Sequence, residues 1–463
     1  MLTRIEIDGF KSFEGFTLDL PSFCVVVGPN ATGKSNLFDA LRLLSQLAET
    51  DVSSAVQELR GEPFELFRVN PDGNSTRRIT IAVEALLDKQ VLDAYGEIHD
   101  LKGTRIRYAV GIELRGPARQ GLERLFVFRE EAGLIRRSED KLFPQGMPKP
   151  SRSALDKWAP SLKKKSTELI ATSQVGAVAT LDVSQDGSQG RPRKVPFGEA
   201  SATFLSTVRT ADEFPHLFAL REELSAFRFL QLNPAAQRMP SDTLSKEEML
   251  PDGSNLATVL ARIKSETLTD FRPSGSLADI RSDLAALIPG VLELEVERND
   301  VARQYQVFLR MRDQARFSSR VLSDGTLRVL ALLTLLHDPK RRGVLCFEEP
   351  ENGIHEARIG GLIDVLRGFC TDLSLEPEKG EKLSQIIVNS HSPTVMRHLK
   401  DEEIVAADTV LVVDPASGGR YRRTRMRTGV TSEMPLRSPE EKEHKLTRIE
   451  LEQLLRQLPD PVQ

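Results

Sequence analysis

The stretch that most constrains this chain is Gly28-Pro29-Asn30-Ala31-Thr32-Gly33-Lys34-Ser35, which fits the phosphate-loop pattern G-x-x-x-x-G-K-[ST] in full. The apolar run Phe23–Val27 precedes it and predicts a buried central strand. The amphipathic residues from Ser35 to Leu47 predict a helix directly after it. Strand, glycine loop and helix is the order that a phosphate site requires, because loop N–H groups and the positive end of a helix both favour an anion.

The residue types inside the loop suit a nucleoside triphosphate. The ammonium group of Lys34 should reach the β- and γ-phosphates, and the hydroxyl group of Ser35 should bind Mg²⁺. Glycine residues let the loop backbone approach the phosphate oxygens closely. We therefore expect Mg-ATP to be bound by Gly28, Pro29, Asn30, Ala31, Thr32, Gly33, Lys34, Ser35 and Asn36.

Consecutive acids follow a second apolar strand, in the run Leu345–Asn352. Two carboxylates at one strand tip can divide the work at a phosphate site. Glu348 would hold Mg²⁺, since this ion prefers oxygen ligands, and Glu349 would orient or deprotonate the attacking water. Alone, Glu-Glu-Pro-Glu is usually the solvated entry to a helix. The functional interpretation is favoured because the same chain carries a complete phosphate loop.

Two shorter motifs also lie beside apolar elements. Leu322–Thr326 precedes an apolar helix, so Ser323 and Gly325 stand at a helix N-terminus, which can bind an anion. His391 follows the strand expected over Gln385–Asn389 and could touch a γ-phosphate. Each motif alone is more typical of a helix cap or a structural histidine, and their order in the chain favours a functional role.

The order of phosphate loop, Leu-Ser-x-Gly signature, strand with Glu-Glu-Pro-Glu, and strand-end histidine resembles the ABC-type ATPase heads of SMC, RecF and OLD-like ATPases. Ile7–Phe13 is similar to the first strand and turn of those heads. Leu232–Pro234, Asp252–Leu256 and Phe347–His355 are similar to the compact OLD/RecF-like branch. The motif-bearing stretches lie within residues 1–50 and 230–400.

What the resemblance implies is a nucleotide held between two heads, so that the protein acts as a homodimer or higher oligomer. The signature of one protomer would complete the site of the other, with Ser323 and Gly325 contacting the γ-phosphate. The same resemblance implies that Asp324 and Thr326 belong to the signature, that Asn352 and His355 lie in an interface loop, and that Lys11 and Ser12 lie near the nucleotide.

The chain departs from this family pattern at three points. Glu348 stands where most such heads carry aspartate, and its longer side chain would shift the geometry around Mg²⁺. Asp324 replaces a signature glycine and brings a negative charge near a phosphate unless its side chain turns away. The glutamine that usually follows the first half of the head has only Gln90 and Gln120 as weak candidates, and its position stays open.

The fold class we expect is α/β: an ABC-type P-loop ATPase head with a central mixed sheet and flanking helices, plus an α+β insertion between its halves. We assign residues 1–125 to the N-terminal half of the head, 126–300 to an insertion or lid region, 301–415 to the C-terminal half, and 416–463 to a basic hairpin and C-terminal helix. The insert contains no heptads, so SMC-type coiled-coil arms are not expected. The residues after His391 give no sign of a fused TOPRIM nuclease domain.

Periodicity predicts several further elements. Strands are expected over Phe16–Leu20 and residues 78–85, 104–114 and 343–347, and residues 130–210 look like irregular loops with short elements. Helices are expected over residues 214–228, 253–267, 327–336, 356–368 and 438–457.

Composition indicates a cytoplasmic protein of ordinary character. The net charge of −4 over 463 residues does not by itself suggest a nucleic-acid partner. The three cysteines lack zinc-ligand spacing and are expected to be reduced thiols. No apolar run approaches the roughly 20 residues that cross a bilayer, so no membrane contact is expected.

One basic run could contact nucleic acid. If Arg420–Arg427 is a strand, Arg423, Arg425 and Arg427 share one face, and arginines in such a row can bind phosphate backbone of DNA or RNA. The alternative is a solvated hairpin paired with the acidic stretch 439–444.

Three functional hypotheses follow. The first is an ATPase and sensor subunit of a prokaryotic anti-phage system, similar to the ATPase subunits of PARIS-type systems, which would act with a separate effector protein such as a nuclease. The second is a RecF-like ATPase of DNA repair or genome maintenance. The third is a nucleotide-gated oligomeric scaffold with little turnover. The first is slightly favoured, because a head without arms or a nuclease domain needs a partner.

Overall fold

A computed structural model describes most of the chain and divides it into two compact units. Unit 1 comprises residues 1–227, 371–385 and 400–463, and unit 2 comprises residues 228–370 and 386–399. The described residues are 1–70, 72–116, 123–142, 151–160, 167–175, 178–185, 193–378, 380–413, 418–431 and 445–456. The chain therefore crosses from unit 1 to unit 2 and back twice.

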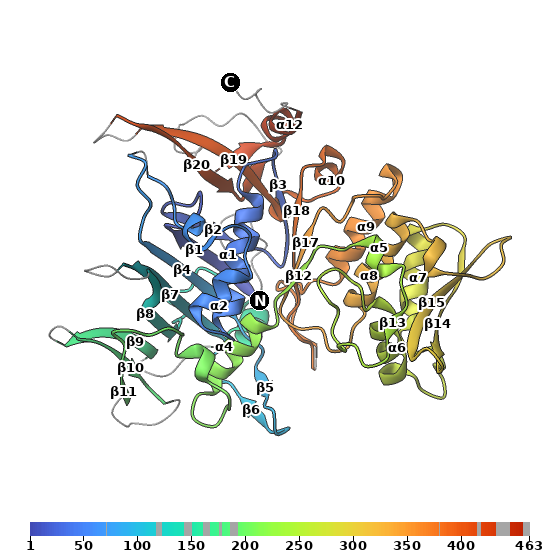
Figure 1. Cartoon of the computed structure of the whole chain (residues 1–463), viewed down its shortest axis with the longest axis horizontal. Helices are drawn as coiled ribbons and strands as arrows, with labels where there is room; N and C mark the ends of the chain where they lie inside the picture. Colours follow the sequence, from blue (N-terminus) through green and yellow to red (C-terminus); the bar gives the residue numbers. More distant parts are fainter. Residues whose placement is uncertain are drawn as a thin grey trace. The chain divides into compact units, whose positions relative to one another are not determined.

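Unit 1 contains an eight-stranded antiparallel sheet with strand order β11-β10-β9-β8-β7-β4-β1-β2 (Figure 1). In sequence order its strands are β1 (Leu2–Asp8), β2 (Phe16–Asp19), β4 (Arg78–Leu86), β7 (Arg105–Arg115), β8 (Arg124–Leu134), β9 (Glu168–Val175), β10 (Val178–Val183) and β11 (Arg193–Pro196). In β1, Ile5 and Ile7 are buried while Arg4 and Glu6 are partly exposed, which is the period of two expected for a strand with one face in the core.

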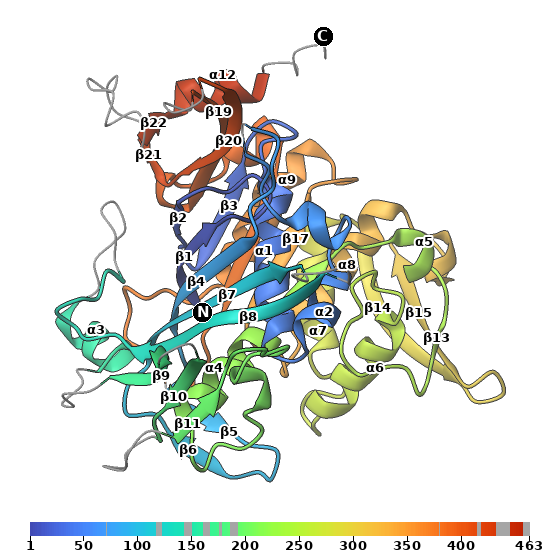
Figure 2. The same cartoon turned by 60° about the vertical axis from the view of Figure 1, so that its left-hand side comes forward.

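Helices α1 (Lys34–Leu47), α2 (Val52–Gln57) and α4 (Pro215–Ser225) lie on one face of this sheet (Figures 1 and 2). Leu37, Leu41 and Leu44 of α1 are fully buried, because apolar residues that recur every three or four positions share one side of a helix. This packing fixes α1, and hence the position of the loop in front of it.

A second group of strands in unit 1 carries the phosphate loop. Strand β3 (Phe23–Val27) is buried at every position and pairs in parallel with β19 (Ile404–Val413). Strand β20 (Arg420–Arg427) pairs antiparallel with β19. Figure 2 shows β21 (Gly429–Thr431), β22 (Lys445–Thr447) and α12 (Arg448–Arg456) gathered beside this pair. Two segments about 400 residues apart in sequence, β3 and β19, are thus neighbours in space.

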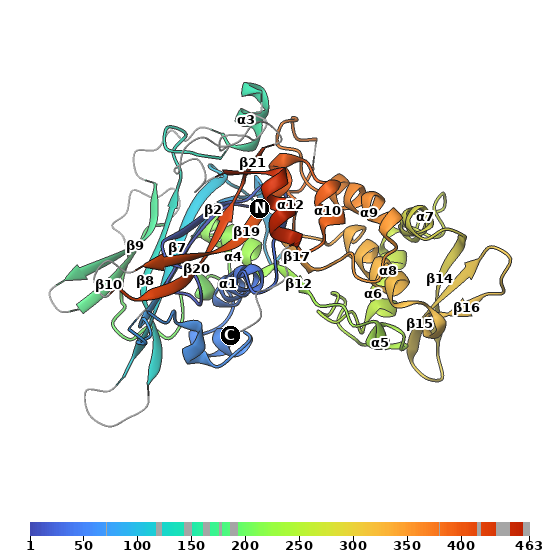
Figure 3. The same cartoon turned by 90° about the horizontal axis from the view of Figure 1, so that it is seen from above.

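Unit 2 combines a short parallel sheet with a group of helices and a long hairpin. Strand β17 (Val344–Glu348) lies between β12 (Arg228–Leu230) and β18 (Gln385–Ser390). The helices α6 (Leu256–Thr267), α7 (Leu277–Leu287), α8 (Asp324–Leu336) and α9 (Glu356–Gly368) complete the core of the unit. In Figure 3 the hairpin β14 (Val291–Asn299) and β15 (Gln304–Met311) lies against α6 and α7. Helix α8 is buried almost throughout, as its run of leucines predicts.

The remaining elements are short. They are η1 (Pro63–Leu66), β5 (Gln90–Leu92), β6 (Ile98–Asp100), α3 (Arg152–Trp158), η2 (Leu205–Thr207), α5 (Pro234–Gln237), β13 (Ser241–Asp242), β16 (Phe317–Ser318), η3 (Ser319–Val321), α10 (Pro393–Arg397) and η4 (Asp401–Glu403). None of the helices in the described part of the chain combines the length and the apolar character needed to cross a membrane.

The structure confirms the α/β fold class and most of the expected elements. Two expectations need correction. Residues 130–210, expected to be irregular loops with short elements, contain the C-terminal part of β8 and all of β9, β10 and β11, which extend the sheet that begins with β1. Within the C-terminal helix expected over residues 438–457, residues 445–447 form strand β22 instead and Arg448–Arg456 form α12, while residues 438–444 and 457 lie outside the described residues. The division into residues 1–125, 126–300, 301–415 and 416–463 follows functional motifs rather than compactness, and it remains a prediction.

Candidate nucleotide site

The phosphate loop joins the end of β3 to the start of α1 and has an unusual backbone. Ala31 has φ 63° and Gly33 has φ 90°, so both adopt the left-handed conformation. Turns of this kind can aim successive N–H groups into one concavity, which is how backbone binds anions. For Ala31, this conformation is a strain that structures usually keep only at functional sites. The geometry therefore fits a phosphate group.

Lys34 is positioned by the loop itself. Its Nζ donates hydrogen bonds to the carbonyl oxygens of Gly28 at 2.7 Å and Pro29 at 2.6 Å, and the residue is only 8% exposed. The N-terminus of α1 has no side-chain cap and no acidic residue in its first turn. The positive end of this helix is thus not neutralised by its own side chains, which favours an external anion.

Two glycines of the loop are required by close packing. A Cβ atom at Gly28 would overlap the carbonyl oxygen of Ala407 on β19, and a Cβ atom at Gly33 would overlap the hydroxyl group of Thr424 on β20. Gly33 is also left-handed, where any other residue is strained. The motif indicated that glycine is needed at these two positions. The structure gives the reason, because strands β19 and β20 leave no room there for a Cβ atom.

Thr424 is a supporting residue that sequence reasoning missed. Its Oγ1 donates to the carbonyl oxygen of Thr32 at 3.2 Å and lies 2.7 Å from the Ser12 hydroxyl, and its N–H donates to the Ser12 carbonyl oxygen at 3.2 Å. The Asn36 side chain also donates to the Ser12 hydroxyl, at 2.8 Å. Ser12, expected near the nucleotide, is therefore part of the scaffold that holds the loop. No local signal links Thr424 to it.

Lys11 is directed to a carboxylate of α1. Its Nζ lies 2.7 Å from Asp39 Oδ2, and Asp39 is buried. Arg60 contacts the other oxygen of Asp39 at 3.2 Å and donates to the Ser35 carbonyl oxygen at 3.2 Å. Both cations pair with Asp39 in the second turn of α1, Arg60 also reaches the first turn through Ser35, and Lys11 itself has the left-handed φ of 47°. A contact between Lys11 and the nucleotide remains a prediction.

In unit 2 the candidate acids lie at the end of β17. Glu348 is the last residue of the strand, and Glu349 has a left-handed φ of 48°. The Glu349 carboxylate lies 2.7 Å from His391 Nδ1 through Oε1 and accepts from Asn352 Nδ2 at 2.7 Å through Oε2. Strand β18 delivers His391, as expected from the sequence. The structure thus brings together three of the predicted site residues, Glu349, Asn352 and His391.

A cavity of about 230 Å³ adjoins these acids within unit 2. It is lined by Leu230, Gln231, Leu232, Arg328, Leu332, Phe347, Glu348, Glu349 and Pro350. The two acids therefore face open space rather than packed core. The hydroxyl oxygen of Ser35 in unit 1 and the carboxylate oxygens of Glu348 in unit 2 are both of the ligand type that Mg²⁺ prefers.

The signature lies at the N-terminus of α8 and is held by contacts within unit 2. Ser323 caps the helix by accepting from the Thr326 N–H at 3.2 Å, and the two hydroxyl groups lie 2.8 Å apart. The Asp324 carboxylate pairs with Arg238, so its negative charge is compensated. Gly325 packs so closely on Gly353 that a Cβ atom would overlap the Gly353 carbonyl oxygen. Nothing in the sequence indicated Arg238. Its ion pair with Asp324 shows how a negative charge is tolerated in the signature.

His355 caps the next helix. Its Nδ1 accepts from the Ala357 N–H at 3.3 Å at the start of α9. This local contact is sufficient to explain the residue, and its expected role in an interface remains a prediction.

The arginine row of β20 is partly engaged inside unit 1. Arg425 and Arg427 lie 2.7 Å and 2.6 Å from Asp408 Oδ2 on β19, and Arg427 is buried. The acidic stretch 439–444, expected to pair with this row, lies outside the described residues. Asp408 pairs with two of the three arginines and offsets one of their charges, and nucleic-acid contact through this row remains only a prediction.

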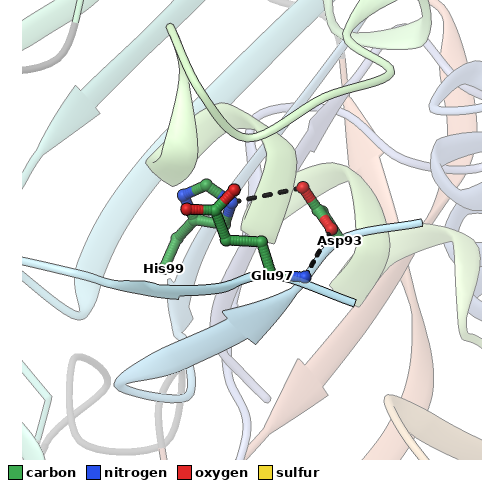
Figure 4. Close-up of side chains that lie close together, drawn as sticks. All are labelled: Asp93, Glu97 and His99. Atoms are coloured by element: carbon green, nitrogen blue, oxygen red, sulfur yellow. Dashed lines mark hydrogen bonds and ion pairs between the residues drawn. The ribbon is translucent and has the colours of Figure 1, made fainter. Parts of the chain in front are cut away.

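One other cluster could offer metal ligands. Asp93, Glu97 and His99 converge at the hairpin of β5 and β6 (Figure 4). The carboxylate of Asp93 accepts from the N–H groups of Tyr95 and Glu97 at 2.9 Å each and lies 3.3 Å from His99 Nε2. Asp93 thus closes the hairpin loop, and this structural role is sufficient to explain the cluster.

Comparison with protein families gives two matches to this chain. The model described as an AAA ATPase domain matches residues 1–175. The model described as "AAA domain, putative AbiEii toxin, Type IV TA system" matches residues 213–397. The first stretch contains the phosphate loop, and the second contains the signature, the acids and the strand-end histidine.

Individual relatives point the same way. The chain is 40% identical over 98 residues to the chromosome partition protein Smc of Bordetella petrii, which is 21% of this chain and 8% of that protein. It is 33% identical over 87 residues to the DNA replication and repair protein RecF of Rhodococcus erythropolis, which is 19% of this chain and 21% of that protein. The matched part thus spans less than a tenth of the length of the Smc relative.

Among solved structures, an Smc head bound to the C-winged helix domain of ScpA aligns with 92% of this chain and 97% of its own, at 12% identity and a TM-score of 0.46. The Smc head domain from Thermotoga maritima aligns with 94% of this chain and 99% of its own, at 12% identity and a TM-score of 0.38.

Proposed function

Because the chain carries an ATPase head of the SMC/RecF-like ABC type, we propose that it binds Mg-ATP and hydrolyses it to ADP and phosphate. The observation that carries this proposal is the phosphate loop: a complete motif, two left-handed residues and an uncapped helix end occur together at residues 28–35. The two ATPase-domain matches support it independently, since each contains part of the expected set of motifs.

The roles of the residues follow from their chemistry. The loop amides and Lys34 hold the phosphates, and Ser35 and Glu348 hold the Mg²⁺ ion, which would compensate the charge of the phosphate oxygens. Glu349 orients the attacking water and accepts its proton as the bond between the γ-phosphorus and the bridging oxygen breaks. His391 Nδ1 lies 2.7 Å from the Glu349 carboxylate, and from this position the imidazole would contact the γ-phosphate.

We further propose that each site is completed by a second protomer. Ser323, Asp324, Gly325 and Thr326 of one chain would reach the nucleotide bound to the loop of another, with Asn352 and His355 in the loop at that interface. The compensation of Asp324 by Arg238 supports this assignment, because it removes a charge that would repel a phosphate. Hydrolysis should then require association.

The proposal is tested by ATP turnover in the presence and absence of EDTA. Glu349→Gln should lower kcat by roughly 100-fold, as expected for the loss of a general base, while ATP still binds. Glu295→Gln, on an exposed position of β14, is the matched control and should behave as wild type. Equal turnover by Glu349→Gln and wild type, or turnover unaffected by EDTA, would contradict these assignments.

The biological role we propose is that of an ATPase subunit in a prokaryotic defence system, acting with a separate effector protein. The family model that matches residues 213–397 carries the description "AAA domain, putative AbiEii toxin, Type IV TA system", and this description favours such a role. Co-purification of the tagged chain from its native host should recover a stoichiometric effector, with a nuclease as the first expectation. Recovery of DNA-repair proteins instead would overturn the defence role.

A second candidate function is genome maintenance, which the partial similarity to Smc and RecF proteins favours. Deletion of the gene separates the two roles. Increased sensitivity to DNA damage would support maintenance, and unchanged sensitivity with loss of phage resistance would support defence. If the protein forms an oligomer with negligible turnover, the scaffold interpretation would replace both.

A further inference from the structure

The carboxylate proposed to act on water is held mainly by hydrogen bonds. The Glu349 side chain is 34% exposed, so packing alone does not fix its rotamer. Two donors fix it instead, one on each oxygen: His391 Nδ1 at 2.7 Å and Asn352 Nδ2 at 2.7 Å. The plane of the carboxylate is defined by this pair. His391 belongs to the expected motif, whereas Asn352 was expected only to lie in an interface loop.

The backbone reinforces this arrangement. Glu349 has a φ of 48°, and its N–H donates to the carbonyl oxygen of Asn389 at 3.0 Å and to the side-chain oxygen of the same residue at 3.2 Å. The Asn352 N–H then donates to the Glu349 carbonyl oxygen at 3.1 Å. The turn from Glu349 to Asn352 thus places the Asn352 side-chain amide next to the Glu349 carboxylate.

Beneath the turn lies a buried anchor. Glu351 is 7% exposed and Ser390 is fully buried, and the Ser390 hydroxyl donates to Glu351 Oε1. The Ser392 N–H donates in turn to the Ser390 hydroxyl oxygen at 3.0 Å. Burial raises the pKa of the Glu351 carboxyl group, and the hydrogen bond from Ser390 lowers it by a smaller amount. The contact ties the turn to the end of β18, where His391 is located, so both donors to Glu349 share one support.

We infer that Asn352 is a positioning residue for Glu349, fixing the carboxylate so that one lone pair is directed at the attacking water. The inference rests on the proposed function. A neutral amide suits the task, because it donates a hydrogen bond without carrying a charge. Aspartate at this position would place a second carboxylate against Glu349, and alanine would leave His391 as the only donor among the described residues.

The inference is tested by steady-state ATP hydrolysis of Asn352→Ala and Asn352→Asp. Asn352→Ala should lower kcat by about 10- to 100-fold, the cost of a misoriented catalytic group, with KM for ATP within twofold of wild type. Asn299→Ala is the matched control: Asn299 is also exposed in unit 2 and makes one side-chain hydrogen bond, to the Ala302 N–H. It should keep wild-type kcat.

The pH profile distinguishes positioning from a purely structural role. At pH 8, Asn352→Asp should be at least as impaired as the alanine variant. Its rate relative to wild type should rise as the pH falls towards 5.5, because the adjacent carboxylate raises the pKa of the new acid and its protonated form can donate as the amide did. A flat ratio, or a loss of kcat matched by a loss of thermal stability, would overturn the inference.

The two proposals fail separately. If Glu349→Gln is inactive and Asn352→Ala has wild-type kcat, Asn352 is not a positioning residue and the ATPase assignment stands. If Glu349→Gln is fully active, the assignment of Glu349 itself is wrong, and the inference about Asn352 falls with it.

Discussion

The N-termini of α1 and α8 both carry a motif expected to meet phosphate, and they are built in opposite ways. Helix α1 begins at Lys34 without a side-chain cap or an acid in its first turn. Helix α8 begins at Asp324 with Ser323 as its cap and with Asp324 paired to Arg238. Among the described residues, no side chain caps the N–H groups of the first helix, which favours an external anion, whereas the second helix has the Thr326 N–H bound by its own Ser323.

This difference assigns separate tasks to the two motifs. The loop amides before α1 should supply much of the affinity for ATP, because the left-handed turn that aims them exists before any ligand binds. The Lys34 ammonium group adds to this affinity by turning from the Gly28 and Pro29 carbonyl oxygens to the phosphates. Ser323 accepts from the Thr326 N–H within its own protomer, and its hydroxyl group would meet a nucleotide only after two protomers associate. The signature should therefore contribute more to turnover than to binding.

The largest effect should follow from Lys34→Ala. Removing the ammonium group proposed to bind the phosphates should weaken ATP binding by roughly 100-fold or more, as measured by calorimetry with a non-hydrolysable analogue. Lys89→Ala, an exposed lysine of unit 1, should bind normally. An unchanged Kd for Lys34→Ala would mean that α1 does not hold the nucleotide.

The two close-packed glycines give a sharper contrast. Gly33→Ala forces a left-handed φ of 90° on alanine and overlaps Thr424, so ATP affinity should fall about tenfold or more. Gly325→Ala disturbs the contact with Gly353 instead, so kcat should fall by a similar factor while the Kd for ATP stays within twofold. If both variants lose affinity equally, the proposed division of tasks is wrong.

A smaller effect is expected from Ser323→Ala. Loss of this helix cap should cost about 1 kcal/mol of unfolding free energy, and kcat should also fall, since the hydroxyl group proposed to reach the neighbouring nucleotide is lost. Ser323→Thr retains a hydroxyl group and should recover most of the stability. Thermal unfolding and ATP turnover measured on the same samples separate the two contributions. Wild-type kcat in a destabilised Ser323→Ala would leave the residue with a capping role only.

The sequence was informative wherever a signal is local. A motif of eight residues defined the phosphate loop, and the apolar runs before Gly28 and Glu348 correctly predicted buried strands β3 and β17. The contacts that hold these motifs are not local. Thr424 supports a loop that lies 392 residues away in sequence at Thr32, and Arg238 compensates a charge 86 residues away at Asp324.

Strands β9 to β11 were missed for a related reason. Their residues are interleaved with charged and glycine-rich stretches, so periodicity is weak, and they become strands by pairing with a sheet that begins at β1. The turn from Glu349 to Asn352 is intermediate between the two cases. Its residues were singled out from the sequence, but the hydrogen bond that joins them depends on a left-handed conformation that the residue types do not predict.

The most direct test of the composite-site account is a mixing experiment. Lys34→Ala and Gly325→Ala should each hydrolyse ATP much more slowly than wild type when alone, and ATP turnover is measured as they are combined at increasing ratios. If the signature acts on the loop of a partner, each mixed dimer contains one site with both motifs intact, so activity should appear on mixing and peak near equal amounts. If activity stays at the level of the separate variants while mixed oligomers form, the signature does not complete the partner's site and the account is wrong.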